Sequence, residues 1–499
     1  MSETGVAGAG ARAMRFMALA LLLVLSACVT APSDSRIKES EFAALEARFT
    51  QHIDVLASEE FGGRRPGTIG ETKTLDYLRR EFESAGFVSG TNDPAHPWNA
   101  PVVLASVTGG ESRIEFQIGR RKVELEAGEA AAFTNRRRGL IEQGELAFVG
   151  FGGGNVGQDI VRGRVAVFLA GEPQAAAETR RTLLERGAVA VMAVLSDGSR
   201  IERMRAQRSR ERLELAVDVD DQLSLFVTEV GMARALGAKA WEELRAAANA
   251  ESGFSAVKLN ARITVEATAQ RREVPSHNFI ARLPGTSPDA GAILLLAHWD
   301  HFGTCGPEDA ADRLCNGAVD NASGLALMIE LGKRLAKGPP LGRDIYVLGT
   351  TAEEWGLLGA RAFAEEPPIP LESIVAAFNF DTVAIGPRGS AVGFIGEGRT
   401  ALDEVIRQAV ADAGRELVPR ERAEPFLQRQ DGWALLQRDV PAVVVSNAFG
   451  DEERFRAFMS STYHQASDEP GKLELGGAVD DLFLHEMLIR RLADPKQYP

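Results

Sequence analysis

Four near-continuous apolar runs, each followed by an amphipathic segment, constrain the fold of this chain more than any other feature. From residue 275 onward, the runs AILLLAH, DIYVLGTT, IVAAFNF and PAVVVSN alternate with helical patterns such as LALMIELGKRLAK, LLGARAFAEE and LDEVIRQAVADAG. Strands that are apolar throughout are buried on both faces, which is typical of a parallel sheet covered by helices. The sequence therefore predicts an α/β fold with a mixed, mostly parallel sheet sandwiched by helices.

The part of the chain before residue 275 has a different organisation. Residues 40–87 show two helical patterns around the Gly/Pro loop GGRRPGTIG, and Gly86 is expected to end the second helix. Residues 100–135 alternate loosely and predict strands. Residues 136–262 contain the short apolar runs ELAFVGFGG, GRVAVFLAG and AVAVMAVLS, each bounded by glycine, with the helical segment TRRTLLERG between the last two. We interpret 136–262 as a separate α/β unit.

Length and charge exclude several classes of protein. A chain of 499 residues is long enough for roughly three domains. Its 56 basic and 70 acidic residues give a net charge of −14, and no long basic run is present. An acidic surface repels phosphate backbones, so no nucleic-acid partner is expected. Three cysteines are too few for a disulfide scaffold.

The amino terminus has the pattern of an export signal. Arg12 and Arg15 precede the apolar run 16–25, which is too short as a helix to span a hydrocarbon core of about 30 Å. The run ends in Leu25-Ser26-Ala27-Cys28, which resembles a bacterial lipobox. We predict a lipoprotein signal over 1–27, lipidation of Cys28, and a polar tether over 28–45. The expected location is the cell envelope at the periplasmic face of the outer membrane; the alternatives are a signal peptide that happens to contain a cysteine, or a short buried helix.

Polar residues with metal-binding side chains follow the predicted strands. His298 ends the first run, Glu353 and Glu354 follow the second, and Asp381 follows the third. Sites of α/β folds form beyond the carboxyl ends of the strands, so these residues are expected to meet. A lone histidine is more often a packing residue, and an adjacent glutamate pair is more often a solvated helix start. Repetition at several strand ends, and the cost of burying so many carboxylates without a cation, favour a metal site instead.

The ordered motifs resemble those of one known family. HWDH, NGAVDNASG, AEEWGLLG, NFD and YHQASDE occur in the order found in the M28 zinc aminopeptidases, over residues 275–470, and residues 56–87 are similar to the family's amino-terminal part. Residues 136–262 resemble the protease-associated (PA) domain through Gly163-Arg164-Val165 and the segment 186–191. An ordinary α/β subdomain is the alternative for that insert.

The resemblance implies a site with two zinc ions per chain. Carried over position by position, His298 and Asp381 bind one ion, Glu354 and His464 bind the other, and Asp320 bridges them. These nitrogen and oxygen ligands suit zinc, although cobalt and manganese stay open.

The same resemblance assigns catalytic roles. Glu353 is the general base that activates a metal-bridging water, and Asp300 orients the imidazole of His298. Tyr463 is placed to stabilise the oxyanion of the intermediate, or else is a packing aromatic. The implied activity is removal of N-terminal residues from peptides that have a free N-terminus.

Three local features complete these expectations. Cys305 and Cys315, separated by nine residues in an exported protein, are expected to form a disulfide rather than two free thiols. Asn316 and Gly317 should allow a sharp turn into Asp320, and Ser323 should cap the following helix. Where many family members have Arg-Ser-Asp-His, this chain has Arg429-Gln430-Asp431-Gly432, which puts side-chain specificity in doubt.

The sequence thus predicts a lipid-anchored dinuclear zinc aminopeptidase. The expected domains are the signal 1–27, the tether 28–45, the amino-terminal catalytic part 46–135, the PA-like insert 136–262, and the catalytic part with the metal site 263–499. The rivals are a glutaminyl-cyclase-like acyltransferase with one zinc, a carboxypeptidase of the same fold, which would need a cationic pocket, and a non-catalytic envelope binding protein.

Overall fold

The computed structural model describes residues 38–152, 156–250, 254–471 and 473–498. The chain divides into two compact units, residues 1–47 and 48–499. The predicted signal, Cys28 and the tether up to residue 37 lie outside the described residues. Among the residues that are described, no helix is both long and apolar enough to cross a membrane.

Two helices form the amino-terminal part, as predicted. They are α2 (Glu39–Leu56) and α3 (Ile69–Ser84), joined through the short helix η1 (Glu59–Arg64). The second helix begins earlier than its apolar pattern indicates, because the Thr68 hydroxyl accepts a hydrogen bond from the Gly70 amide at 3.2 Å and caps it. The chain turns away at Gly86, whose φ of +93° favours glycine.

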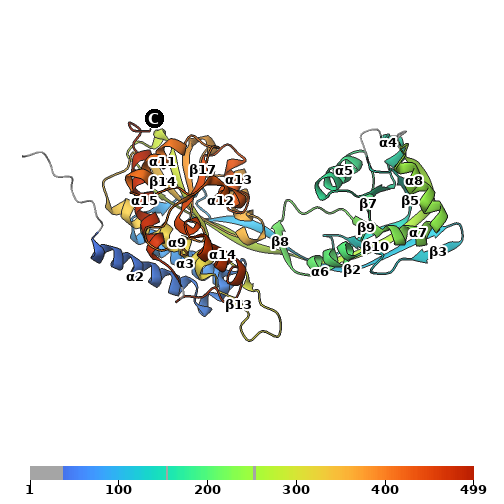
Figure 1. Cartoon of the computed structure of the whole chain (residues 1–499), viewed down its shortest axis with the longest axis horizontal. Coiled ribbons are helices and arrows are strands. Elements are labelled where there is room, and N and C mark those ends of the chain that lie inside the picture. Colours follow the sequence, from blue (N-terminus) through green and yellow to red (C-terminus); the bar gives the residue numbers. More distant parts are fainter. Residues whose placement is uncertain (1–37, 153–155, 251–253, 472, 499) are drawn as a thin grey trace, which may run out of the picture. The chain divides into compact units, whose positions relative to one another are not determined.

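The predicted parallel strands lie side by side in one sheet (Figure 1). The order β17-β15-β11-β14 is parallel throughout, and antiparallel strands β16 and β10 flank it. Each of the four parallel strands coincides with one of the apolar runs. The bounds are β11 (Ala292–His298), β14 (Asp344–Thr350), β15 (Ile374–Asn379), β16 (Gly393–Ile395) and β17 (Ala442–Ser446).

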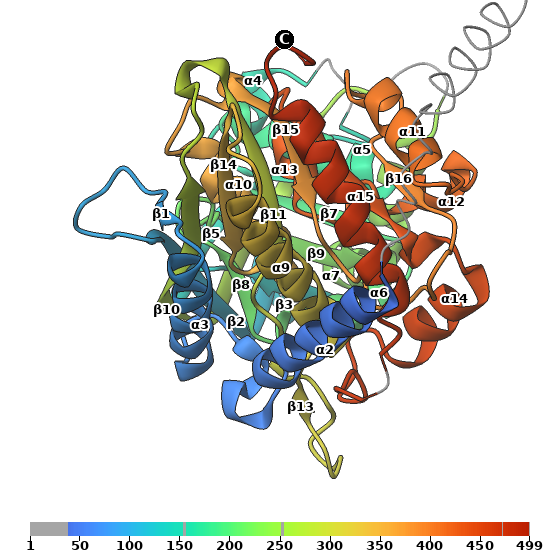
Figure 2. The same ribbon diagram turned by 90° about the vertical axis from the view of Figure 1, so that its left-hand side faces the viewer.

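Helices cover both faces of this sheet. Figure 2 shows α9 and α15 side by side on one face, and α10 and α13 pack against the other. On that second face, Leu294 and Leu348 belong to a buried cluster with Phe363 and Leu435. The helix bounds are α9 (Gly324–Lys337), α10 (Leu358–Glu365), α11 (Asp403–Asp412), α12 (Arg420–Ala423), α13 (Gly432–Leu436), α14 (Glu452–Ser461) and α15 (Gly476–Leu492).

A second set of parallel strands, β5-β6-β7-β9, forms within the predicted insert. Strand β10 (Val257–Leu283) pairs with β2 (Asn99–Ile118), β5 and β14, so both sets belong to one continuous hydrogen-bonded sheet. The other bounds are β1 (Val88–Ser89), β3 (Arg121–Glu124), β4 (Ala130–Phe133), β5 (Arg138–Phe148), β6 (Val165–Leu169), β7 (Ala190–Leu195), β8 (Arg212–Leu215), β9 (Ser224–Thr228), α4 (Gln158–Val161), α5 (Pro173–Glu185), α6 (Ser199–Arg208), α7 (Glu229–Leu236) and α8 (Ala238–Ala248).

One edge of the predicted insert, at 135/136, lies between β4 and β5, but the other does not coincide with an element boundary. The expected limit at 262/263 falls inside β10. Residues before 136, including Ile114, Phe116 and Ala130, share a buried apolar cluster with strands β5, β6 and β7. The domain limits and the PA-like character of this unit therefore stay predictions.

Candidate metal centre

The carboxyl ends of three neighbouring strands gather the predicted site residues. His298 is the last residue of β11 and is in register with Thr350, the last residue of β14. Asp381 follows the end of β15 by two residues, and Glu353 and Glu354 follow β14. Because β15, β11 and β14 are adjacent and parallel, their ends meet at one edge of the sheet.

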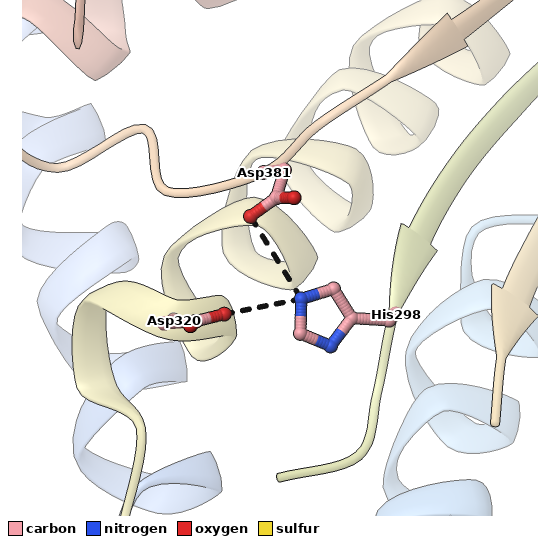
Figure 3. Close-up of side chains that lie close together, drawn as sticks. All are labelled: His298, Asp320 and Asp381. Atoms are coloured by element: carbon pink, nitrogen blue, oxygen red, sulfur yellow. Dashed lines mark ion pairs between the residues drawn. The ribbon is translucent and has the colours of Figure 1, made fainter. Parts of the chain in front are cut away.

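The first group of ligand atoms surrounds the Nε2 atom of His298. This atom lies 3.1 Å from Oδ1 of Asp320 and 3.8 Å from Oδ1 of Asp381, and Figure 3 shows both carboxylates facing the imidazole. His298 is 1% exposed and Asp320 is 3% exposed, whereas the Asp381 side chain is 16% exposed, so this group reaches solvent mainly through Asp381. One ligand atom from each of the three residues lies within 4.8 Å of the others.

The second group uses the other oxygen of Asp320. Nε2 of His464 lies 3.3 Å from Oδ2 of Asp320 and 2.9 Å from Oε2 of Glu354. The remaining oxygen of Glu354, Oε1, contacts Nδ1 of His301. His301, Asp320 and Glu354 also have ligand atoms within 4.8 Å of one another. His301 belongs to the HWDH motif, yet the sequence analysis assigned it no role.

The charges of both groups fit a divalent cation. Burial by itself would raise the pKa of Asp320, but hydrogen bonds from His298 and His464 hold it well below the usual range. Burial would likewise lower the pKa of His464, whereas its contacts with Asp320 and Glu354 raise it to about 9. Protons on the histidines thus supply the positive charge that stabilises the buried carboxylates. A metal ion supplies this charge instead when it binds and displaces those protons. The nitrogen and oxygen donors match the preferences of zinc.

Glu353 lies beside the ligands without belonging to either group. It lines a cavity together with Asp320 and Asp381. Burial, together with the negative charges of Asp431 and Glu354, raises the pKa of Glu353 well above its usual range. The residue before it, Ala352, has a φ of +52°, a backbone conformation that costs free energy for a non-glycine residue and that clusters at functional sites. A carboxyl group in this setting suits proton transfer.

Asp300 acts on the site differently from the expectation. Its carboxylate Oδ1 is 3.9 Å from Nδ1 of His298, too far for a hydrogen bond, and the backbone carbonyl of Asp300 accepts from Nδ1 at 3.1 Å instead. This bond still favours the tautomer whose Nε2 is free to face a metal. The Asp300 carboxylate accepts from the backbone amide of Glu353 at 3.0 Å. It therefore positions the general-base candidate.

Tyr463 lies at the rim of the same cavity. Its ring stacks on His464 with a centroid distance of 3.6 Å, and its hydroxyl oxygen is 3.5 Å from Nη2 of Arg429. Burial, followed by the charges of Asp320 and Glu354, raises the pKa of Tyr463. The phenol therefore keeps its proton and can donate a hydrogen bond into the cavity.

A buried arginine that the sequence analysis passed over holds two site loops together. The guanidinium of Arg64, in the loop GGRRPGTIG, is fully buried and donates to the carbonyls of Trp299 at 2.8 Å, Asn316 at 2.6 Å and Gly317 at 2.9 Å. Burial lowers the pKa of Arg64 to about 10, although nearby carboxylates favour its charge. It ties the chain after His298 to the chain before Asp320.

The turn into Asp320 is partly as predicted. Gly317 has a φ of +59°, and a Cβ there would lie 2.0 Å from the Asp320 carbonyl oxygen, so glycine is required. The expected cap at Ser323 is wrong: this residue is itself helical, and its hydroxyl donates to the Val319 carbonyl at 2.7 Å. Asp468 instead fixes the turn, because its carboxylate accepts from the amides of Val319 and Asp320 at 2.9 and 3.0 Å.

The expected disulfide is present in the structure. Cys305 and Cys315 are bonded and close the hairpin of β12 (Gly303–Thr304) and β13 (Leu314–Cys315). The sulfur of Cys305 lies 3.6 Å from the carbonyl of His464. The bridge therefore braces the loop before Asn316 and contacts the backbone of a ligand residue.

In the segment that departs from the family pattern, Gln430, which lines the cavity, and Asp431, which the family shares, are both buried. The Thr350 hydroxyl donates to Asp431, whose pKa burial raises to about 6. The Gln430 side-chain oxygen accepts from Asn379 at 3.1 Å and from the amide of Gly432 at 2.7 Å. Gln430 and Asp431 thus brace the ends of β15 and β14.

Two known proteins are similar in sequence to part of this chain. A probable lipoprotein aminopeptidase, LpqL, of Mycobacterium tuberculosis is 29% identical over 181 residues, which cover 36% of this chain and 32% of that protein. A probable glutamate carboxypeptidase, LAMP1, of Arabidopsis thaliana is 37% identical over 101 residues, which cover 19% of this chain and 14% of that protein. The chain therefore matches only a third or less of the length of these two relatives.

One solved structure shares the fold over most of this chain. The aminopeptidase from Aneurinibacillus sp. strain AM-1 superposes with a TM-score of 0.51 at 18% sequence identity, over 90% of this chain and 93% of that one. Residues 278–480, which contain every predicted metal ligand, match the model of Peptidase family M28. This segment of the chain, which carries the paired groups around Asp320, is therefore similar to peptidase family M28.

Proposed function

We propose that this chain is an aminopeptidase that binds two zinc ions and removes N-terminal residues from peptides. His298 and Asp381 would hold one ion, and His464 and Glu354 would hold the other. The observation that carries this proposal is the position of Asp320, whose Oδ1 faces His298 and whose Oδ2 faces His464. A carboxylate with one oxygen in each group is the arrangement that a bridging ligand needs.

We assign His464 to the second ion and His301 to the support of Glu354. Nε2 of His464 pairs with one oxygen each of Asp320 and Glu354, whereas the hydrogen bond of His301 is to the opposite oxygen of Glu354, although a ligand atom of His301 also lies within 4.8 Å of Asp320. A histidine that donates to a ligating carboxylate fixes its orientation.

The side chains around the cavity supply the proton transfers. Bound zinc would polarise the scissile carbonyl and acidify the attacking water. The Glu353 carboxylate takes the proton of this water and delivers it to the nitrogen of the leaving amine, whose bond to the carbonyl carbon breaks. The Tyr463 hydroxyl donates to the oxygen that gains negative charge. The carboxylates of Asp320, Asp381 and Glu353, which line the cavity, attract the ammonium group of a free N-terminus.

Metal analysis combined with an activity assay tests the proposal. Purified residues 29–499 would be measured for bound zinc and for hydrolysis of aminoacyl-p-nitroanilides, with the N-acetylated compounds as controls. We expect close to two zinc ions per chain, cleavage only of the free-amine compounds, and loss of cleavage after chelation.

Other outcomes would assign the chain to its rivals. One zinc ion with cyclisation of N-terminal glutamine would show a glutaminyl-cyclase-like enzyme. Cleavage of N-acetylated dipeptides at their C-terminal residue would show a carboxypeptidase, an activity that the printed name of one relative also carries. Zinc without any hydrolysis would support a binding protein.

Attachment to the membrane through Cys28 is a separate proposal. It rests on the lipobox-like Leu25-Ser26-Ala27-Cys28, and one relative is named as a lipoprotein. In cells that express the full chain, Cys28→Ser should move the protein from the membrane fraction to the soluble fraction. Retention of this variant in the membrane fraction would contradict lipidation there.

A further inference from the structure

The cavity beside the metal ligands has two chemically different ends. Its acidic end carries Asp320, Glu353 and Asp381. Apolar side chains form much of the remaining wall, and these are Ile395, Phe426, Val444, Phe449, Phe455 and Met459. Arg429 is the only cationic residue among the described residues that line this cavity.

Arg429 is held by aromatic rings rather than by an acid. Its guanidinium carbon lies 5.5 Å from the ring centre of Phe426 and 5.8 Å from that of Tyr463. The only polar contact of its side chain, within the described part of the chain, is the 3.5 Å approach to the Tyr463 hydroxyl. Neighbouring Arg420 differs, since it forms an ion pair with Glu424 at 3.1 Å. The guanidinium of Arg429 thus keeps donors available for a carboxylate.

The contact between Arg429 and Tyr463 limits the distance between the Arg429 guanidinium and the scissile bond of a bound peptide. If the Tyr463 hydroxyl donates to the scissile carbonyl, a hydrogen bond of about 2.7 Å places Nη2 of Arg429 no more than about 6 Å from that oxygen. Consecutive residues are about 3.8 Å apart along a peptide. A group on the residue after the scissile bond is therefore within reach of the guanidinium.

We propose that Arg429 binds the C-terminal carboxylate of a dipeptide, so that dipeptides with an apolar first residue are the preferred substrates. This inference rests on the proposed aminopeptidase function. A dipeptide is a zwitterion whose ammonium group matches the acidic end of the cavity and whose carboxylate matches Arg429. The first side chain then faces the apolar wall. Arg429 is a specificity residue in this arrangement, not a participant in the proton transfers.

Three leucine substrates separate recognition of the carboxylate from the chemical step. They are Leu-Gly, Leu-glycinamide, which lacks only the negative charge, and leucine p-nitroanilide. We expect kcat/KM of the zinc-loaded protein to be roughly 10- to 100-fold higher for Leu-Gly than for Leu-glycinamide, as a charged hydrogen bond would give. In Arg429→Ala this ratio should fall to about one, and Arg429→Lys should restore part of it, since lysine keeps the charge but not the fork of donors. Arg420→Ala, the matched control, should keep the full ratio.

The outcomes distinguish this proposal from the one on which it rests. Equal losses on all three substrates in Arg429→Ala would show that Arg429 acts through Tyr463 and would overturn the proposal. A wild-type ratio near one, with p-nitroanilide cleavage intact, would also overturn it while leaving the aminopeptidase function in place. If N-acetyl-Leu-Gly is cleaved and p-nitroanilides are not, the aminopeptidase function is wrong; an Arg429-dependent preference for the carboxylate would then persist in a carboxypeptidase.

Discussion

The chain contains two sets of parallel strands with similar local sequences and different chemistry at their ends. In β11 of the peptidase part and in β7 of the predicted insert, every residue is buried. Strand β11 ends in His298, whereas β7 is followed by Ser196 and Asp197, both exposed. Apolar strands therefore build the sheet in either place, and the residues just beyond them decide whether a site forms.

Buried polar groups show the same contrast. Among the described residues of 136–262, Thr228 is the only polar side chain in the fully buried class. Between 263 and 499 the buried class includes many charged or ligating side chains, among them His298, Asp300, His301, Asp320, Glu330, Asp431 and Asp468. Burying such groups costs free energy unless partners or a cation compensate. The segment that matches the M28 model carries this cost and the insert does not, which is consistent with the function proposed for the site.

The largest expected effect comes from the general base. Glu353→Gln removes the carboxylate that transfers protons but leaves every proposed ligand, so kcat should fall by about 10²- to 10⁴-fold while zinc content stays near that of wild type. Kinetics on leucine p-nitroanilide and metal analysis measure the two quantities. Wild-type turnover in this variant would remove Glu353 from the mechanism.

Two ion pairs of equal length allow a buried glutamate of the M28-like segment to be compared with an exposed glutamate that pairs with the insert. Nε of Arg48 lies 2.6 Å from Glu330, and Nε of Arg138 lies 2.6 Å from Glu266, but the glutamate side chains are 3% and 42% exposed. At pH 7, Glu330→Gln should lower the free energy of unfolding by about 1–3 kcal/mol, because Glu330 also accepts from His52 and Lys333. Glu266→Gln should change it by less than about 1 kcal/mol. Urea unfolding of both variants measures the difference.

The effect of Glu330 should also depend on pH. Burial alone would raise its pKa, but hydrogen bonds from His52, Arg48 and Lys333 lower it below the ordinary value of 4.5. A carboxyl whose pKa is lower in the folded state stabilises the fold above the unfolded pKa and loses this contribution as the pH falls through the folded one. The difference in free energy of unfolding between wild type and Glu330→Gln should therefore become smaller below about pH 4.5. If this difference in stability grows as the pH falls, the pKa of Glu330 is not lowered in the folded state.

A smaller effect is expected where the insert contacts the site. Glu211, just before β8, accepts from Arg65 at 2.7 Å, and Arg65 donates to the Phe302 carbonyl at 3.0 Å and lies over the ring of Trp355. Phe302 in turn contacts His464 edge to face. Since a partly exposed pair contributes up to about 1 kcal/mol, Glu211→Gln should lower kcat/KM by no more than about fivefold, without loss of zinc. A loss of two orders of magnitude would mean that the insert belongs to the active site itself.

The smallest effect is expected at the end of β7. Asp197 only accepts hydrogen bonds from Ser199, including that from its amide at 2.8 Å. Asp197→Asn should leave kcat/KM and zinc content within about twofold of wild type, because an exposed substitution of this kind rarely exceeds about 0.5 kcal/mol. A marked loss of activity would show that residues after the insert strands also contribute to the site, contrary to the difference described above.

Local sequence patterns were enough to predict the parallel sheet and to name the proposed ligands. Apolar runs and helical periodicity are local properties, and they placed β11, β14, β15 and β17 correctly. The ligands could be named because they directly follow those runs or lie in ordered family motifs. The segment that matches the M28 model was outlined at 275–470, close to the 278–480 observed.

The groups that support the proposed ligands could be identified only from the folded chain. Arg64 donates to Asn316 across 252 positions, and Asp468 accepts from the Asp320 amide across 148 positions. No local sequence pattern predicts such a contact, because the sequence around an arginine in a Gly/Pro loop does not show whether the side chain is buried or exposed. The failed cap at Ser323 and the carbonyl contact of His298 depend on backbone geometry in the same way. Residue types and their order come from the chain, whereas the partner of each polar group is set by which distant segments the folded core brings together.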